Sequence, residues 1–376
     1  MIIRIGLVFR AMIGPGHCGA AVALAALVLA VAASSGTYRP ADDWPDVEIE
    51  TVGLGGHITN LTRNPALDTS PAVSRDRTRI AFVSSRDGQP DVYTMKTDGT
   101  DVRRVTTSPF SIGGDMVEVA WNDAGHTIVS WSPNGKRLAF DAQNATFPST
   151  CFHNCVVPKV LVTRSDGTGL QLVSDDAGTP TWSADGRRLA YRDGISPFQD
   201  SETLTILTVG SGAAVHLKVN AFYDFFDPPA WSSGGLLAFD ALTGDGRPFT
   251  VRVVRPDGTG QRKLGLGSTP VWSPNGTRLA FVRSGRVYTI AARGGPAKRL
   301  SGKAQASGPA WSPDGKWIAY LRTAGKPALT QIAVVPAAVG AERVLTHLPK
   351  GSAFDARLTW TADSKKVVFT LFHVQS

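Results

Sequence analysis

The chain has 376 residues, of which 42% are hydrophobic and 19% charged, and it contains 39 glycines and 24 prolines. This composition fits a turn-rich globular protein with a large apolar core and argues against disorder beyond the termini. The formal net charge of +8 favours acidic partners. Nucleic acid is not an expected partner, because no run of Lys and Arg is interleaved with aromatic residues.

The N-terminus has the pattern of an export signal. Arg4 and Arg10 precede an apolar run of alanine, leucine and valine at residues 20–33, and Ala30-Val31-Ala32 matches a small-residue cleavage pattern. We therefore predict that residues 1–32 are a signal peptide and that the protein is periplasmic, cell-surface or secreted. An uncleaved membrane anchor is the alternative, because residues 2–9 add hydrophobicity. Residues 33–45 would form a linker, and residues 46–376 one domain.

The first predicted strands lie in "DVEIETVGLGGHITNLT", residues 46–62. This stretch aligns with "DVYTMKTDGTDVRRVT" from Asp91, which has an Asp-Gly turn between two apolar-polar runs. Both stretches are predicted to form a pair of strands joined by a tight turn.

A hairpin motif follows in seven copies. The clearest is "GPAWSPDGKWIAYLR" from Gly308, and its anchor residues are spaced by 39 to 58 positions. A period of about 40–50 residues with strand-like content is typical of a four-stranded propeller blade. The seven anchors are Val73, Trp131, Trp182, Trp231, Trp272, Trp311 and Trp360.

The motif has a direct physical interpretation. Ser-Pro-Asn/Asp-Gly presets a tight turn, and the following Leu-Ala-Phe/Tyr, as at residues 279–281, predicts a short buried strand. The tryptophan is predicted to pack between blades rather than to stack on a ligand. Second halves with a Gly turn follow most copies, so each unit is a hairpin, a strand, a turn and a strand.

The seventh copy ends at Ser376 without its outer pair of strands. We predict that residues 46–62 supply this pair, which would close the ring and remove an open sheet edge. The expected fold is therefore all-β, a single seven-bladed propeller closed by its N-terminal strands. Six or eight blades are the alternatives, because "WNDAGHTIVS" from Trp121 overlaps the next copy of the motif.

Two cysteines remain after the expected cleavage, Cys151 and Cys155 in "CFHNC". In an oxidising compartment they are predicted to form a small loop disulfide. A metal site with His153 is the alternative, but it lacks the second ligand pair that makes zinc spacing specific. No cofactor or metal is expected, and no catalytic motif stands out from the background.

The loops that connect the predicted strands differ in length between repeats only on one side of the expected ring, and this side is where we expect a binding site. These loops are residues 107–130, 141–158, 192–202, 220–228 and 347–357. Variable loops on a rigid scaffold commonly carry recognition. In "AFYDFFDPP" from Ala221, Tyr223, Asp224, Phe225 and Asp227 would form a platform for a sugar or peptide; packing against the next blade is the alternative. Six charged residues are expected just after the second strands, at one mouth of the ring: Asp141, Arg192, Asp193, Asp240, Arg283 and Arg322. Together they would bind a polar ligand or a divalent ion. The alternative is that they are solvated strand ends without a ligand.

From about residue 46 to the end, the repeats resemble the TolB-like, WD40-like (PD40) propeller family, whose motif is Pro-x-Trp-Ser-Pro-Asp-Gly. The resemblance implies the propeller fold and says little about function. Similar propellers occur in TolB, in tricorn-type proteins and as gating domains of prolyl-oligopeptidase-like enzymes. TolB carries an α/β domain before its propeller, whereas only about 13 residues precede the first strand here after the expected cleavage site, so a place in the Tol machinery is not expected. The sequence also has no Gly-x-Ser-x-Gly elbow of a peptidase domain.

The expected function is that of an exported, non-enzymatic and monomeric binding or scaffold module. Its partner would be a protein or an acidic cell-envelope polymer, bound through the face with variable loops. The alternative is a polysaccharide lyase or hydrolase that uses carboxylates at the mouth of the ring. Such an enzyme should bring together two carboxylates, or a metal with histidine.

Overall fold

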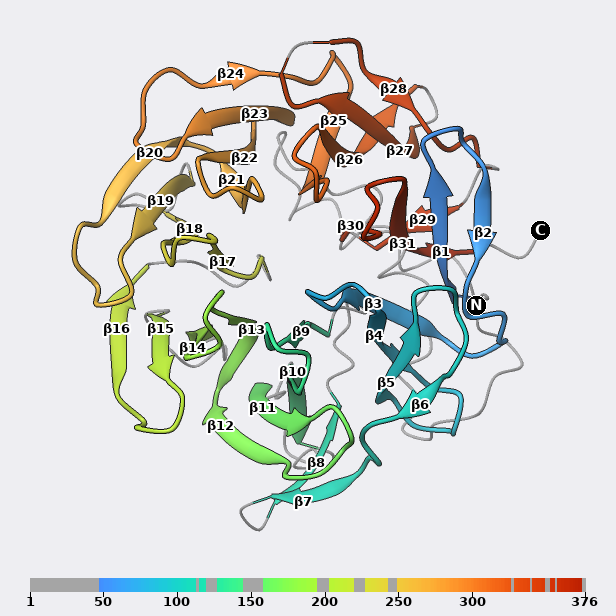
Figure 1. Cartoon of the computed structure of the whole chain (residues 1–376), viewed down its shortest axis with the longest axis vertical. Coiled ribbons are helices and arrows are strands. Elements are labelled where there is room, and N and C mark those ends of the chain that lie inside the picture. Colours follow the sequence, from blue (N-terminus) through green and yellow to red (C-terminus); the bar gives the residue numbers. More distant parts are fainter. Residues whose placement is uncertain are drawn as a thin grey trace, which may run out of the picture.

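Seven β-sheets surround a common axis in the computed structural model of the chain (Figure 1). The structure describes residues 47–112, 115–119, 127–144, 158–194, 203–219, 227–242, 249–325, 328–338, 340–348, 352–355 and 357–373. All regular elements in these ranges are strands. No helix long and apolar enough to span a membrane is found in the described part of the chain.

Five blades are four-stranded sheets whose strands follow chain order from the axis outward. Blade 1 contains β3 (Asp68–Val73), β4 (Arg79–Ser84), β5 (Asp91–Lys96) and β6 (Arg103–Arg104). Blade 3 contains β13 (Ala177–Trp182), β14 (Arg188–Asp193), β15 (Thr203–Thr208) and β16 (Ala214–Lys218). Blade 4 contains β17 (Ala230–Trp231), β18 (Leu237–Ala241), β19 (Thr250–Val254) and β20 (Arg262–Leu266). Blade 5 contains β21 (Ser268–Trp272), β22 (Arg278–Arg283), β23 (Arg286–Ala291) and β24 (Lys298–Arg299). Blade 6 contains β25 (Gln305–Trp311), β26 (Trp317–Ala324), β27 (Leu329–Pro336) and β28 (Arg343–Val344).

Blades 2 and 7 keep four strand positions but have a divided inner edge. Blade 2 contains β7 (Phe110–Ile112), β8 (Asp115–Val119), β9 (Val129–Trp131), β10 (Arg137–Asn144), β11 (Pro158–Arg164) and β12 (Gln171–Asp175). Blade 7 contains β29 (Ala353–Phe354), β30 (Thr359–Trp360), β31 (Lys366–Phe372), β1 (Val47–Gly53) and β2 (Ile58–Asn60). Both β8 and β9 pair with β10, and both β29 and β30 pair with β31.

The segment 107–130, expected to be a loop between blades, therefore contains part of blade 2. Strands β7 and β8 form a hairpin, and β8 extends the inner edge of the sheet beyond β9. The competing motif at Trp121 lies outside the described residues. Within the described residues there are seven sheets, as expected, not six or eight.

The N-terminal strands close the ring, as the sequence predicts. Strand β1 pairs antiparallel with β31 over seven residue pairs, from Val47 opposite Phe372 to Gly53 opposite Lys366, and β2 pairs with β1 on the outside. Blade 7 thus combines both ends of the described chain (Figure 1). This pairing leaves no open sheet edge in blade 7 where the N-terminal strands join it.

The repeated motif forms the turn and core that its residues predict. In blade 2 the backbone amide of Gly135 donates to the carbonyl of Ser132, and the amide of Arg137 donates to the Ser132 hydroxyl. Gly135 has φ of 67°, which favours glycine at this position. The aromatic side chain of each second strand is buried in the core between blades; these residues are Phe82, Phe140, Tyr191, Phe239, Phe281, Tyr320 and Phe369.

Motif tryptophans link neighbouring blades, which confirms their predicted packing role. The indole Nε1 of Trp131 in blade 2 donates to the carbonyl of Ala72 in blade 1 at 2.9 Å. Trp231, Trp272 and Trp360 donate in the same way to the inner strand of the preceding blade. Because the indoles of Trp131, Trp231, Trp272 and Trp360 are hydrogen-bonded within the ring, these four tryptophans are not available to stack on a ligand.

The two faces of the ring differ in their connections. The turn between first and second strands has five residues in every blade, for example residues 74–78 and 312–316. The connections between second and third strands range from two residues, 284–285, to thirteen, 145–157. Second strands run in the same direction in all blades, so these connections leave the same side. We call this side the strand-end face and the opposite side the turn face.

Candidate functional site

The charged residues expected at the mouth of the ring lie within the last four positions of the second strands, not after them. Asp141 belongs to β10, Arg192 to β14 and Asp240 to β18, each directly after the core aromatic of its strand. The same position in the other blades holds Val83, Val282, Leu321 and Thr370. Charge at this position therefore occurs in three consecutive blades, 2, 3 and 4.

Arg192 and Asp240 form a buried ion pair at the strand-end face. An Arg192 guanidinium nitrogen lies 2.7 Å from Asp240 Oδ1, and the two side chains are only 3% and 2% exposed. The other carboxylate oxygen of Asp240 accepts a hydrogen bond from the amide of Thr269 at 3.1 Å. Arg192 Nε also donates to the carbonyl of Asp227 at 3.2 Å. One pair of charges thus ties together blades 3, 4 and 5.

Asp141 has a similar position between blades 2 and 3. Its two carboxylate oxygens accept hydrogen bonds from the amides of Ile128, at 3.0 Å, and Thr179, at 2.8 Å. Burial raises the pKa of Asp141 to about 7, although the two amides and the charge of Arg357 act to lower it. Arg357 belongs to blade 7, which is not a neighbour of blade 2. The charge of Arg357 therefore acts on Asp141 from a blade that is not its neighbour.

The two aspartates have a common structural task. Thr179 and Thr269 have φ of 60° and 52°, and each lies in an irregularity of the inner strand where the pairing register shifts. A carboxylate from the preceding blade accepts the hydrogen bond of the amide at each of these residues. Asp141 and Asp240 therefore satisfy backbone donors that the sheet leaves unpaired.

Asp193 points away from this cluster. It follows Arg192 in β14, and successive side chains of a strand lie on opposite faces of the sheet. Its carboxylate accepts hydrogen bonds from Ser174 Oγ at 3.0 Å and from Thr205 Oγ1, whose oxygen is 2.9 Å from His216 Nδ1. Burial raises the pKa of Asp193. Arg192 thus contacts blade 4, whereas Asp193 contacts blade 2 and the outer strands of its own blade.

Arg283 and Arg322 also contact their own blades. The guanidinium carbon of Arg283 lies 3.9 Å from the ring centroid of Tyr288. Arg322 Nε is 2.7 Å from Glu342 Oε1, and a guanidinium nitrogen is 3.0 Å from Gln331 Oε1. Both arginines are held by side chains of the third strand or beyond, so they are not part of the cluster around the axis.

The structure thus joins Arg192, Asp240 and the carbonyl of Asp227 and holds Asp141 separately between blades 2 and 3, so it does not bring the six predicted charges together. Tyr223, Asp224 and Phe225 lie outside the described residues, as do Cys151, His153 and Cys155. The described carboxylates of Asp141, Asp193 and Asp240 have separate hydrogen-bond partners. No group of three metal-binding side chains occurs in the part of the chain that the structure describes.

The role of the aspartates has a signal in the sequence repeats. Ala-Phe-Asp occurs at residues 139–141 and 238–240, and in both cases the next blade begins with Thr-Pro-x-Trp, at Thr179 and Thr269. The other blades have neither Ala-Phe-Asp before them nor Thr-Pro-x-Trp. Because Ala-Phe-Asp occurs only where Thr-Pro-x-Trp follows, the sequence indicates that the aspartate contacts the next blade. Arg357 belongs to no repeated motif and could not be found in this way.

Comparison with known proteins agrees with this architecture. A family model described as the TolB beta propeller domain matches residues 158–375. A TolB homologue from Chlorobium luteolum is 27% identical over 161 residues, which cover 42% of this chain and 30% of the relative. The match therefore spans less than a third of that relative's length.

Two solved structures share the fold at low sequence identity. A TolB candidate from Agrobacterium tumefaciens has a TM-score of 0.51 at 14% identity, covering 88% of this chain and 99% of the other. A puromycin-hydrolysing peptidase from Mycobacterium tuberculosis has a TM-score of 0.56 at 15% identity, covering 85% of this chain and 53% of the peptidase. At such identities, these structures support the fold and not a shared activity.

Proposed function

The chain belongs to the TolB β-propeller family, and from this premise we propose that it is an exported, non-enzymatic binding or scaffold protein that recognises its partner through the strand-end face. The observation that carries the proposal is the contrast between the two faces. The seven turns between first and second strands have five residues each and the turns between third and fourth strands have four to seven, whereas the connections between second and third strands on the strand-end face range from two to thirteen residues. Loops that vary in length on a rigid scaffold commonly carry recognition.

The buried charges support this role because they stiffen the scaffold beneath the variable connections. The Arg192 and Asp240 pair joins three blades, and Asp141 joins two. Both signs of charge are present around the axis, which suits a polar partner. The net charge of +8 becomes +6 when Arg4 and Arg10 leave with the signal peptide, so an acidic protein or an acidic cell-envelope polymer is the proposed class of partner.

The contacts of the carboxylates favour binding over catalysis. A polysaccharide lyase or hydrolase at this face would need a carboxylate pair, or a metal, aimed at one substrate atom. Asp141 and Asp240 are instead committed to backbone amides of the next blade, and Asp193 faces the outer strands of its own blade. The proposed function therefore assigns them a structural role.

Export is part of the same proposal and has its own test. The basic and apolar segment of residues 1–32 motivates it. Mass spectrometry of the native protein should find a chain that begins close to Ala33. Recovery of intact Met1 from a membrane fraction would replace the signal peptide with an anchor.

Retention of envelope components on the immobilised protein tests the binding face. Residues 145–157 and 195–202 would be replaced, in separate variants, by the two-residue connection Ser284-Gly285. As a matched control on the turn face, residues 273–277 would be exchanged for residues 312–316, which form a turn of the same length. We expect at least one shortened variant to lose the retained component while the control keeps it. Equal retention by all variants would overturn the proposed face.

A further inference from the structure

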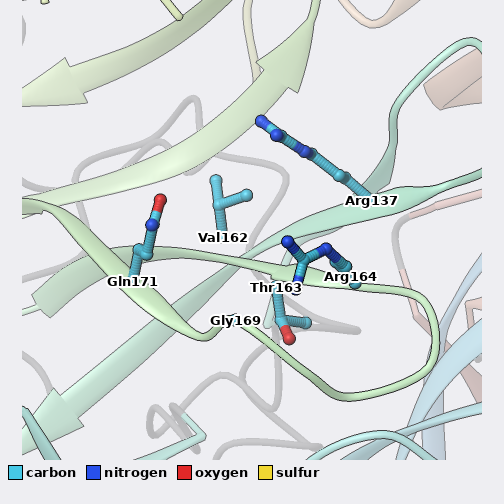
Figure 2. A pocket seen from close by; sticks show the side chains of 6 residues that line it. All are labelled: Arg137, Val162, Thr163, Arg164, Gly169 and Gln171. Atoms are coloured by element: carbon cyan, nitrogen blue, oxygen red, sulfur yellow. The ribbon is translucent and has the colours of Figure 1, made fainter. Parts of the chain in front are cut away.

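Blade 2 carries two arginines directly opposite one another on the turn side of the ring. Arg137 of β10 is the register partner of Arg164 of β11. Together with Val162, Thr163, Gly169 and Gln171 they line a small pocket, in which both arginine side chains extend from neighbouring strands (Figure 2). Like charges directly opposite in a sheet are destabilising, so such a pair calls for an anion.

Blade 1 has the same arrangement together with the anion. Arg79 lies opposite Lys96, and the carboxylate of Asp101 is 2.8 Å from the Arg79 guanidinium. A second guanidinium nitrogen of Arg79 donates to the carbonyl of the same Asp101 at 2.9 Å. Arg103 Nε also lies 2.8 Å from the Asp101 carboxylate. Asp101 thus neutralises Arg79 of the opposed pair together with Arg103 of β6, while Lys96 interacts electrostatically with Asp98.

Blade 2 lacks this aspartate. The turns "KTDGTD" from Lys96 and "RSDGTG" from Arg164 align, which places Gly169 at the position of Asp101. The two residues share a left-handed conformation, with φ of 56° at Asp101 and 68° at Gly169. The turn therefore has the same backbone conformation at this residue as in blade 1, but it lacks the carboxylate and has Gln171 in the place of Arg103.

No other acid of the described chain takes its place. The Arg137 guanidinium has no hydrogen bond or ion pair with any described residue. Arg164 donates a hydrogen bond to Thr168 Oγ1 at 3.1 Å and interacts electrostatically with Asp166. The Oδ1 atom of Asp166 accepts hydrogen bonds from the amide and the hydroxyl of Thr168. Lys96 and Asp98 have the same relation in blade 1, so Asp166 is not a substitute for Asp101.

Blade 4 shows what happens when the pair itself is removed. Its turn "RPDGTG" also has glycine, Gly260, at the position of Asp101, but the residue at the position of Arg137 is Leu236. Arg255 then has no opposed cation. At this register position of the second and third strands, two opposed cations without an intervening acid occur only in blade 2 of the described blades; at other positions, Arg252 lies opposite Lys263 and Arg283 opposite Arg286.

We propose that this pocket binds the carboxylate of an aspartate from a partner protein. Arg137, Arg164 and Gln171 are exposed, so an external carboxylate can reach them. Arginine forks match carboxylates with two parallel hydrogen bonds. In blade 1, Arg79 donates hydrogen bonds to both the carboxylate and the main-chain carbonyl of Asp101. An aspartate in a peptide offers both groups, whereas a uronic acid of a glycan has no amide carbonyl. The site lies on the turn face, so it is independent of the binding face proposed above.

The test uses ¹⁵N-labelled protein and the capped tripeptide Ac-Gly-Asp-Gly-NH2, with the arginine Nε–H resonances as readout. The peptide should shift the signals of Arg137 and Arg164 with a dissociation constant on the order of 1–10 mM. Gly169→Asp should abolish this response, because the protein then supplies its own carboxylate as in blade 1. Arg137→Leu, which copies blade 4, should weaken binding by about tenfold or more.

Matched probes and a reverse variant complete the test. Ac-Gly-Asn-Gly-NH2 should leave both resonances unchanged, and Asp101→Gly should create a second responsive site at Arg79. Thermal melting of each variant checks that it remains folded. An unchanged response in folded Gly169→Asp or Arg137→Leu would overturn the site. A response to digalacturonate that exceeds the response to the aspartyl peptide would overturn the choice of a protein partner.

Discussion

At the scale of single residues, the aspartates that follow the core aromatics serve the neighbouring blade. Asp141 and Asp240 look like candidate ligand-binding groups in the sequence, because charge at a strand end is usually solvated or functional. Their burial could not be predicted, since it depends on how blades pack against each other. The strand position of both residues was predicted to within a few residues, and their hydrogen-bond partners were not.

Neutralising Asp240 should destabilise the folded protein strongly. Asp240→Asn removes the charge of one carboxylate that binds the guanidinium of Arg192, which is 3% exposed. We expect a loss of about 3–5 kcal/mol in the free energy of unfolding. Denaturant unfolding measures this, and the double variant Arg192→Met with Asp240→Leu should recover most of the loss. A single variant as stable as the wild type would mean that the ion pair does not hold the blades together.

Asp141 should make stability depend on pH. Its pKa is raised from 3.8 to about 7 in the folded state, so the folded protein holds a proton that the unfolded chain releases above pH 4. The free energy of unfolding should therefore fall as the pH rises from about 4 to about 7. In Asp141→Asn, residue 141 cannot titrate, so the free energy of unfolding lacks this pH-dependent contribution.

The measurement is the difference in unfolding free energy between wild type and Asp141→Asn across that range. Other buried acids, such as Asp68, are present in both proteins and cancel in the difference. The difference should change by more than about 1 kcal/mol between pH 4 and pH 7, because one pKa unit corresponds to about 1.4 kcal/mol. A constant difference would show that Asp141 has an ordinary pKa in the folded protein.

At the scale of elements, the hairpins were predictable because their signals are local. The Ser-Pro-Asn/Asp-Gly turn, the tryptophan and the buried aromatic lie within about 12 residues of each other in each copy. The divided inner edges of blades 2 and 7 were not predictable. Strands β8 and β29 lie in segments without a repeated motif, and they are defined by pairing with β10 and β31.

The aromatic segment before blade 4 remains a predicted recognition element. Changing Tyr223 and Phe225 to Ala should abolish retention of the envelope partner and leave the melting temperature nearly unchanged, because exposed residues contribute little to stability. If the two aromatics are instead part of the core, each truncation should cost about 3–5 kcal/mol and lower the melting temperature visibly. Retention assays and thermal melting on the same preparations separate the two outcomes.

At the scale of the whole molecule, ring closure joins the two ends of the described chain. The sequence indicated it because the last repeat lacks two strands and residues 46–62 resemble those strands. The structure confirms the pairing, with β1 inserted between β31 and β2. Closure makes the seven blades mutually dependent, since each blade then has two neighbours.

Deletion of residues 46–62 should accordingly remove the cooperative thermal transition. Without β1, strand β31 would expose an unpaired edge, and the aromatic core of blade 7 around Phe369 would open to solvent. Differential scanning calorimetry of the full and shortened proteins makes the comparison. A shortened protein that melts like the full one would place closure of the ring elsewhere.

The central claim is that the strand-end face is the recognition surface of a rigid propeller. Hydrogen–deuterium exchange of the mature protein, with and without the envelope component that it retains, tests this claim most directly. Binding should slow exchange in the connections at residues 145–157, 195–202, 220–226 and 243–248, and leave the five-residue turns unchanged. Slower exchange confined to the five-residue turns, with none in these connections, would contradict it.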